Sequence, residues 1–178
     1  MNRIAVLTLL GFFFINPRAY AQNLTLDQTM NYLQSKVAEF GKFDQVTKGN
    51  HELSELTFWA DTSKICYVRM TEMISFKPVG KTKFQDVQTW EYEVDLHHLD
   101  KEALDVYGSD GFVKPVTLTW RCKNSAQNIR RFNAAGKSGF DFKKAFNFRA
   151  NVKDVERISK AFAHAVRLCE DMDVDPFD

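Results

Sequence analysis

The sequence has little cysteine, proline or glycine, and it has no long apolar stretch beyond its N-terminus. Among 178 residues there are three Cys, four Pro and eight Gly. A transmembrane helix needs about 20 consecutive apolar residues, and no stretch after residue 21 approaches that length. Basic and acidic residues nearly balance, 24 against 23, so the net charge attracts neither nucleic acid nor an anionic membrane. These absences favour a single soluble domain and no nucleic-acid partner.

Signatures of cofactor and metal binding are also missing. The Gly-Lys-Ser of 136–138 would need Gly at position 131 to form a phosphate-binding loop, and Arg131 stands there. His97 and His98 are adjacent, so on a strand they would point to opposite faces and could not readily bind one ion. We therefore expect no cofactor and no metal.

The first 21 residues predict a secretory signal peptide. Arg3 precedes an apolar run of twelve residues, Ile4–Ile15, and Ala19-Tyr20-Ala21 matches the small-x-small cleavage pattern. Twelve residues rise about 18 Å as a helix, too short for a hydrocarbon core of about 30 Å. We expect residues 1–21 to be removed, 22–170 to form one domain and 171–178 to form an acidic tail. The protein would then be exported, to the periplasm or the medium.

The three cysteines, Cys66, Cys122 and Cys169, all fall on apolar faces of predicted elements. Their separations of 56 and 47 residues do not resemble the short spacings of zinc sites. An oxidising compartment allows one disulfide with one thiol left over, and the sequence does not choose among the three pairings.

Two helices are predicted from apolar residues that recur at helical spacing. The first begins with a capping box of Thr25 and Gln28 and ends at Gly41, where a left-handed glycine is expected. The last is capped by Asn151, with the acidic Asp154 in its first turn. Their apolar stripes are Leu26, Met30, Leu33, Val37 and Phe40, and Val155, Ile158, Phe162, Ala165, Val166 and Cys169.

Alternation of apolar and polar residues predicts strands between these helices. The segment 90–97 alternates most strictly, which indicates a sheet with one wet face and places His97 on that exposed face. The polar segment 42–52 contains Gly49-Asn50 and is expected to be a loop. The expected strands are 53–60, 65–70, 74–77, 90–97, 116–122, 128–132 and 140–148.

The fold class that follows is α+β, with an N-terminal helix, an antiparallel meander of about seven strands and a C-terminal amphipathic helix. Short turns and missing helical crossovers argue against a parallel sheet. In this element order the chain resembles the pleckstrin-homology-like superfold, or a partly open barrel. Its segments 26–33 and 155–169 are similar to those of uncharacterised small exported bacterial proteins. The resemblance implies binding rather than catalysis, although a fold alone does not fix a function.

The segment 121–149 concentrates positive charge in an otherwise neutral chain. It holds eight basic residues, Lys137 among them, and one acidic residue, Asp141. Five interleaved phenylalanines are expected to anchor it in the core and leave the charges outward: Phe132, Phe140, Phe142, Phe146 and Phe148. The candidate binding residues are Arg121, Lys123, Arg130, Arg131, Lys143, Lys144 and Arg149. They would suit an acidic protein or a polyanionic surface, unless the acidic tail and the 91–95 face neutralise them within the fold.

Three functions remain open at this point. The first is an exported binding domain that is not an enzyme and contacts an acidic partner through 121–149. The second is a carrier of a small apolar ligand inside a barrel cavity. The third is a hydrolase with dispersed catalytic residues, for which Glu91, Glu93 and Asp95 on one strand face are the available carboxylates.

Overall fold

The structure is a computed structural model that describes residues 24–47, 50–61, 63–78, 80–81, 85–102, 104–108 and 115–172. The expected signal peptide and most of the expected acidic tail, residues 173–178, lie outside the described residues. Neither described helix is long and apolar enough to cross a membrane.

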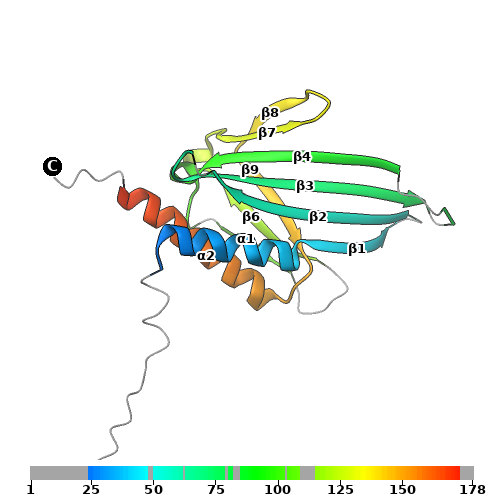
Figure 1. Cartoon of the computed structure of the whole chain (residues 1–178), viewed down its shortest axis with the longest axis horizontal. Coiled ribbons are helices and arrows are strands. Elements are labelled where there is room, and N and C mark those ends of the chain that lie inside the picture. The colour runs from blue at the N-terminus through cyan, green and yellow to red at the C-terminus, as the bar shows by residue number, and fades with distance from the viewer. Residues whose placement is uncertain are drawn as a thin grey trace, which may run out of the picture.

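Strands occupy the middle of the chain, and one α-helix flanks them on each side (Figure 1). The elements in order are α1 (Leu26–Phe40), β1 (Lys42–Thr47), β2 (Asn50–Ala60), β3 (Tyr67–Pro78), β4 (Gln85–Asp95), the 3-10 turn η2 (Leu96–His98), β5 (Val106–Tyr107), β6 (Val116–Arg121), the 3-10 turn η3 (Lys123–Ser125), β7 (Ile129–Asn133), β8 (Ser138–Asp141), β9 (Lys143–Phe148) and α2 (Val152–Met172).

The strands form two antiparallel sheets. The larger has six strands in the order β1-β2-β3-β4-β7-β8, and the smaller has three in the order β5-β6-β9. Figure 1 shows the smaller sheet crossing behind the larger one, with both helices packed at one end of the layers. The predicted α+β class with antiparallel strands between two helices is confirmed. The sheets are open, and the described residues contain nine strands rather than about seven.

Both predicted helices are confirmed, but Gly41 ends α1 for a different reason from the one expected. The capping box of Thr25 and Gln28 is present, and the buried residues of α2 are the predicted stripe. Gly41 has a φ of −80°, outside the left-handed region. A Cβ on Gly41 would lie 2.7 Å from the Cβ of Leu56. Glycine is therefore required because the end of α1 touches β2 directly.

The expected loop at 42–52 is wrong, because β1 and the start of β2 form a hairpin there. The register runs from Lys42 opposite Glu55 to Thr47 opposite Asn50. Since β1 is an edge strand of the larger sheet, its backbone pairs without the apolar alternation that marks a strand facing a core. The polar composition of the segment concealed its conformation.

Aromatic side chains fill the space between the two sheets and α2. Phe162 of α2 packs edge-to-face on Phe58 and Trp120, and Phe146 packs in the same way on Trp120 and Tyr92. These centroid distances of 4.8–5.6 Å lie in the favourable range for aromatic pairs.

The expectation that five phenylalanines of 121–149 anchor in the core is only partly confirmed. Phe146 and Phe148 are buried, whereas Phe140 is 58% exposed and Phe142 is also exposed. The four share a parity in the sequence, but the chain leaves the larger sheet after β8 and enters the smaller one at β9. Sequence alternation therefore does not predict, beyond Phe142, whether a side chain points into the core or to the solvent.

Candidate binding site

The eight basic residues of 121–149 are distributed over both sheets, and most are already paired. The ion pairs are Arg121 with Asp105 at 2.9 Å, Lys123 with Glu170 at 2.7 Å, Arg130 with Glu93 at 3.5 Å, Arg131 with Asp141 at 3.5 Å and Lys144 with Glu72 at 2.6 Å. Lys137, Lys143 and Arg149 are exposed and pair with no carboxylate in the described part of the chain. The acidic-partner hypothesis stays a prediction, and it now depends on these three.

Lys144 points between the two sheets rather than outward as expected. Its Nζ donates to the Glu72 carboxylate at 2.6 Å and to the Tyr92 hydroxyl at 2.9 Å, and it lies 4.2 Å from the centre of the Tyr92 ring. Burial lowers the pKa of Lys144, but attraction and hydrogen bonds to Glu72 and Tyr92 together outweigh burial and leave this pKa raised. Burial raises the pKa of Tyr92. The cluster joins β9 to β3 and β4 and removes Lys144 from any charged contact surface.

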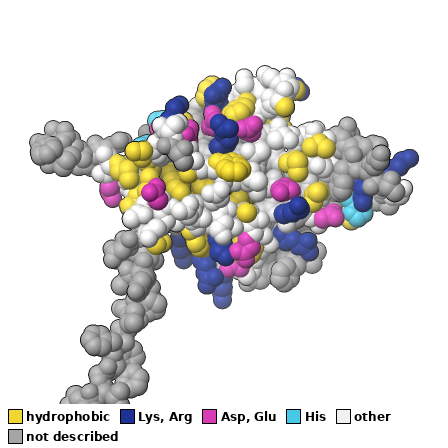
Figure 2. Space-filling model, in the orientation of Figure 1, with side chains coloured by type: hydrophobic (Ala, Val, Ile, Leu, Met, Phe, Trp, Pro, Cys, Tyr) yellow, Lys and Arg dark blue, Asp and Glu magenta, His cyan; other side chains and the backbone are white. Residues whose placement is uncertain are grey.

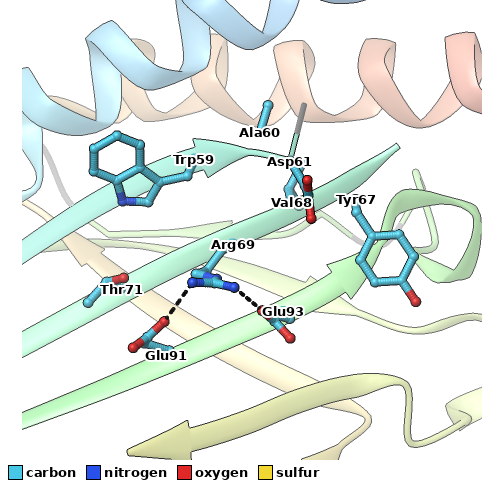
Figure 3. A pocket seen from close by; sticks show the side chains of 9 residues that line it. All are labelled: Trp59, Ala60, Asp61, Tyr67, Val68, Arg69, Thr71, Glu91 and Glu93. Carbon is cyan, nitrogen blue, oxygen red and sulfur yellow. Dashed lines mark hydrogen bonds and ion pairs between the residues drawn. The ribbon is translucent and has the colours of Figure 1, made fainter. Parts of the chain in front are cut away.

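The outward face of β3 and β4 holds a pocket of about 430 Å³ with charged walls (Figure 3). The pairing register brings Arg69 opposite Glu93 and beside Glu91. The Arg69 guanidinium donates to Glu93 at 2.5 Å and lies 3.2 Å from the Glu91 carboxylate. Figure 3 shows these contacts along the strands, with Trp59 on the neighbouring strand β2. Two of the three carboxylates that line the pocket, those of Glu91 and Glu93, thus already pair with one cation, and the third belongs to Asp61.

A second pocket, of about 660 Å³, adjoins the first and shares Trp59, Ala60, Asp61 and Tyr67 with it. Its other walls come from α1, the β2–β3 turn and the end of α2, and they include Met30, Ile65 and Met172. We call the two adjoining pockets the Trp59 groove. Figure 2 shows hydrophobic side chains gathered at this end of the molecule, where α1 begins and α2 ends.

Exposed apolar surface makes this groove unlike an ordinary polar surface. Trp59 is 53% exposed, Ile65 73% and Met172 53%. Moving apolar surface of such side chains out of water is favourable by about 25 cal/mol per Å² of surface buried. A contiguous exposed apolar patch with a polar rim is typical of an interaction site.

The apolar pocket is also acidic. Asp27 and Asp61 line it, and no basic residue does so among the described residues. The Ser63 hydroxyl donates to the Asp61 carboxylate at 2.6 Å and the Ser63 N–H donates at 2.8 Å. These hydrogen bonds hold the pKa of Asp61 below its usual value, so Asp61 stays ionised. The groove therefore complements a ligand that is apolar and positively charged.

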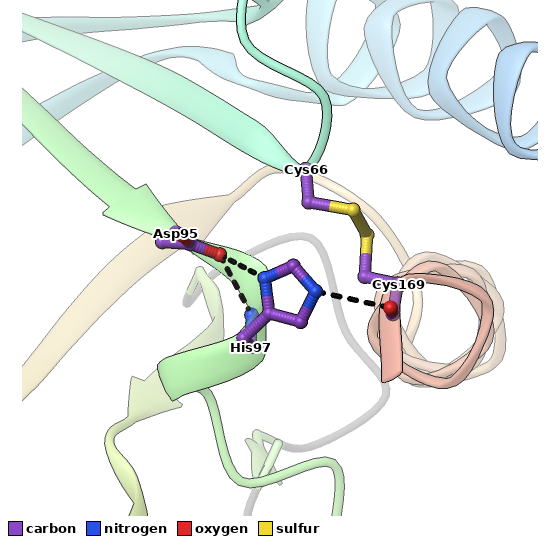
Figure 4. The surroundings of a disulfide bond; sticks show 4 residues. All are labelled: Cys66, Asp95, His97 and Cys169. Carbon is purple, nitrogen blue, oxygen red and sulfur yellow. Dashed lines mark hydrogen bonds and ion pairs between the residues drawn. A yellow bond between two sulfur atoms is a disulfide. The ribbon is translucent and has the colours of Figure 1, made fainter. Parts of the chain in front are cut away.

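A disulfide between Cys66 and Cys169 fixes the walls of the groove relative to one another (Figure 4). It is the single disulfide that the sequence allowed, and it leaves Cys122 as a buried thiol. Cys66 has a φ of 67° in the β2–β3 turn, a conformation that non-glycine residues rarely adopt. The bond ties this turn to the last part of α2, so that Ile65 and Met172 face the same pocket.

His97 adds a second tie at the same corner. Its Nδ1 lies 2.5 Å from the Asp95 carboxylate, and its Nε2 donates to the carbonyl of Cys169 at 3.0 Å (Figure 4). His97 lies against Asp95 of the predicted wet face and is half-buried to the same degree as Asp95, because its ring also contacts α2. The more exposed of the two histidines is His98, since β4 ends at Asp95 and the 3-10 turn η2 follows it.

The carboxylates that line the charged pocket are already engaged by neighbouring side chains. Glu91 and Glu93 both pair with Arg69, and Asp61 accepts from Ser63, so oxygens that a general base would use have partners. Among the described residues no group of three His, Cys, Asp or Glu side chains is placed to hold a metal ion. What the groove offers is an exposed indole, aliphatic walls and fixed charges.

The sequence contained one signal for this site that the basic-segment hypothesis overlooked. Trp59 stands on the polar parity of its strand, opposite Leu56, Phe58 and Ala60, and a tryptophan on the wet face of a sheet is a candidate contact residue. The pockets themselves depend on α1, β2, β3 and α2 together, which alternation within one strand does not reveal. No protein-family model, curated protein or solved structure matches the chain, so its resemblance to pleckstrin-homology-like proteins stays a prediction.

Proposed function

We propose that the protein is an exported binding domain that captures an extended, basic and apolar segment of a partner protein in the Trp59 groove. The observation that carries this proposal is the exposed Trp59 between two adjoining pockets, one with charged walls and one with apolar and acidic walls. Tryptophan is enriched among the residues that dominate binding energy at protein interfaces.

Charge determines the partner class. Asp27 and Asp61 add negative charge to the apolar pocket, while Arg69 is balanced by Glu91 and Glu93 in the other pocket. A partner with alternating apolar and basic side chains can place the former against Met30 and Ile65 and the latter near the two aspartates. Export is supported by the N-terminal sequence and by the disulfide, since such bonds persist in oxidising compartments.

Isothermal titration calorimetry with two synthetic peptides tests this proposal. The probe is an eight-residue peptide of alternating lysine and leucine with blocked ends, and its match has glutamate in place of lysine. The lysine peptide should bind saturably, and the glutamate peptide should not. Trp59→Ala should weaken binding about 30-fold, the equivalent of a hot-spot loss of about 2 kcal/mol.

Phe140→Ala is the matched control, because Phe140 is exposed to a similar degree, 58%, and lines neither pocket. It should leave the affinity for the lysine peptide unchanged. Equal affinity for the two peptides, or an equal loss in the Trp59 and Phe140 variants, would contradict the proposal.

A further inference from the structure

A separate cleft lies between α1 and α2, on the other side of α1 from the Trp59 groove. Its volume is about 250 Å³, and its walls include Leu24, Tyr32 and Ala161. On α1 the cleft uses Thr29 and Tyr32, whereas the groove uses Leu26, Met30 and their neighbours, so the two share no residue. The helix α1 therefore separates two independent concave surfaces.

Basic side chains line this cleft, in contrast to the acidic groove. Arg157, Lys160 and His164 line it from one edge of α2, and none of the described lining residues is acidic. Their spacing of three and four residues places them on one side of the helix. Figure 2 shows Lys and Arg side chains gathered along the lower edge of the molecule, below the helices.

These three basic side chains differ in the ion pairs and hydrogen bonds that they already form. Arg157 pairs with Asp154 at 3.0 Å, and the Nε2–H of His164 donates to the carbonyl of Leu24 at 3.0 Å. Lys160 is exposed, and it forms no ion pair with any carboxylate of the described segments. A ligand anion would therefore meet Lys160 as its main partner, with Arg157 beside it.

We infer that this cleft binds a small anionic amphiphile, an aliphatic carboxylate whose chain lies on Leu24, Tyr32 and Ala161 and whose head group pairs with Lys160. Charge complementarity fixes the sign of the head group, because bases line the cleft and acids do not. The apolar walls fix the character of the tail. The volume of about 250 Å³ lies just below the range of about 300–1,000 Å³ that holds drug-sized ligands, so the chain is short.

Octanoate is the probe that tests this inference, with octylammonium and octanol as ligands of equal chain length. In heteronuclear NMR titrations of the oxidised protein at about 0.15 M salt, where the Debye length is about 8 Å, octanoate should shift resonances of residues 29–32 and 157–164 saturably. Octylammonium and octanol should not do so. Lys160→Glu should weaken octanoate binding about tenfold or more, as expected for loss of a charge-assisted contact.

Two further variants keep the result interpretable. Lys153→Glu makes the same charge change on the same helix but outside the cleft, and it should change the affinity for octanoate less than about twofold, because exposed charges at that distance are largely screened. Ala161→Phe fills the cleft and should abolish the saturable shifts without unfolding the protein. Binding of octylammonium as tight as that of octanoate, equal effects of the Lys160 and Lys153 changes, or no saturation by octanoate would overturn the inference. Shifts confined to residues of the Trp59 groove would overturn it as well.

Discussion

Replacing both Cys66 and Cys169 by alanine removes a covalent link between residues 103 positions apart in the sequence. In the chain-entropy treatment a closed loop of about 100 residues lowers the free energy of folding by about 4.7 kcal/mol at 25 °C, and removal of native disulfides costs about 2–5 kcal/mol. Since domains of this size are stable by about 5–15 kcal/mol, we expect the double variant to lose about 4 kcal/mol. That is about a quarter or more of the total.

Urea denaturation followed by far-UV circular dichroism measures this loss. With a slope of about 2 kcal/mol per molar urea, the midpoint should fall by about 2 M. Reduction of the unaltered protein with dithiothreitol should produce a similar shift, and Cys122→Ala should keep that response because Cys122 is outside the bond. A loss below about 1 kcal/mol in the double variant would refute the reasoning.

Thiol titration gives an independent check of the pairing. Cys122 is buried, and burial raises the pKa of its thiol, so the native protein should react with no thiol reagent. One thiol should react after denaturation and three after denaturation with reduction. Three reactive thiols before reduction would show that the disulfide is not formed.

Two predictions concern charged clusters. Lys144→Met leaves the buried carboxylate of Glu72 without a cation, because Lys144 is its only ion-pair partner among the described residues. The variant should lose about 3–5 kcal/mol of folding free energy in urea denaturation, and adding Glu72→Met should restore most of that stability. An equal or larger loss in the double variant would contradict this. Hydrogen bonds from Lys101 and Lys123 hold the pKa of Glu170 below its usual value. Ionised Glu170 therefore stabilises the fold at a pH above its unfolded-state pKa, and this contribution is lost as the pH falls through the lowered pKa of the folded state. Glu170→Gln should therefore cost about 1 kcal/mol at pH 7, and this cost should shrink as the pH falls through the lowered pKa. A cost that does not change with pH would argue against the ion pairs.

Local patterns predicted the elements whose residues face a single core. The stripe of α2 from Val155 to Cys169 is buried as expected, because a helix that packs on one side must repeat its apolar residues at helical period. The capping box at Thr25 was equally predictable, since both of its members lie within one turn. The strict alternation of 90–95 likewise gave the direction of every side chain in that part of β4.

Features that depend on two distant elements were not predictable in this way. Lys144 lies inside because Glu72, 72 residues earlier, supplies a buried partner. Cys66 pairs with Cys169 rather than Cys122 because the β2–β3 turn meets the end of α2. The Trp59 groove requires α1, the β2–β3 turn and α2 to converge, and no periodicity encodes that meeting. In each case the deciding contact is between segments whose relative position only the fold supplies.

The order of the cysteines along the chain has a consequence for how the protein acquires its disulfide. A chain that enters an oxidising compartment N-terminus first presents Cys66 and then Cys122, and these two are not partners in the folded protein. The correct partner of Cys66 arrives last, on the C-terminal helix. Oxidation before that moment produces a mispaired bond, which must then be exchanged through thiolate attack. Early sequestration of Cys122 by β6 and β7 would suppress this error, so the yield of native protein should depend on the timing of folding relative to oxidation.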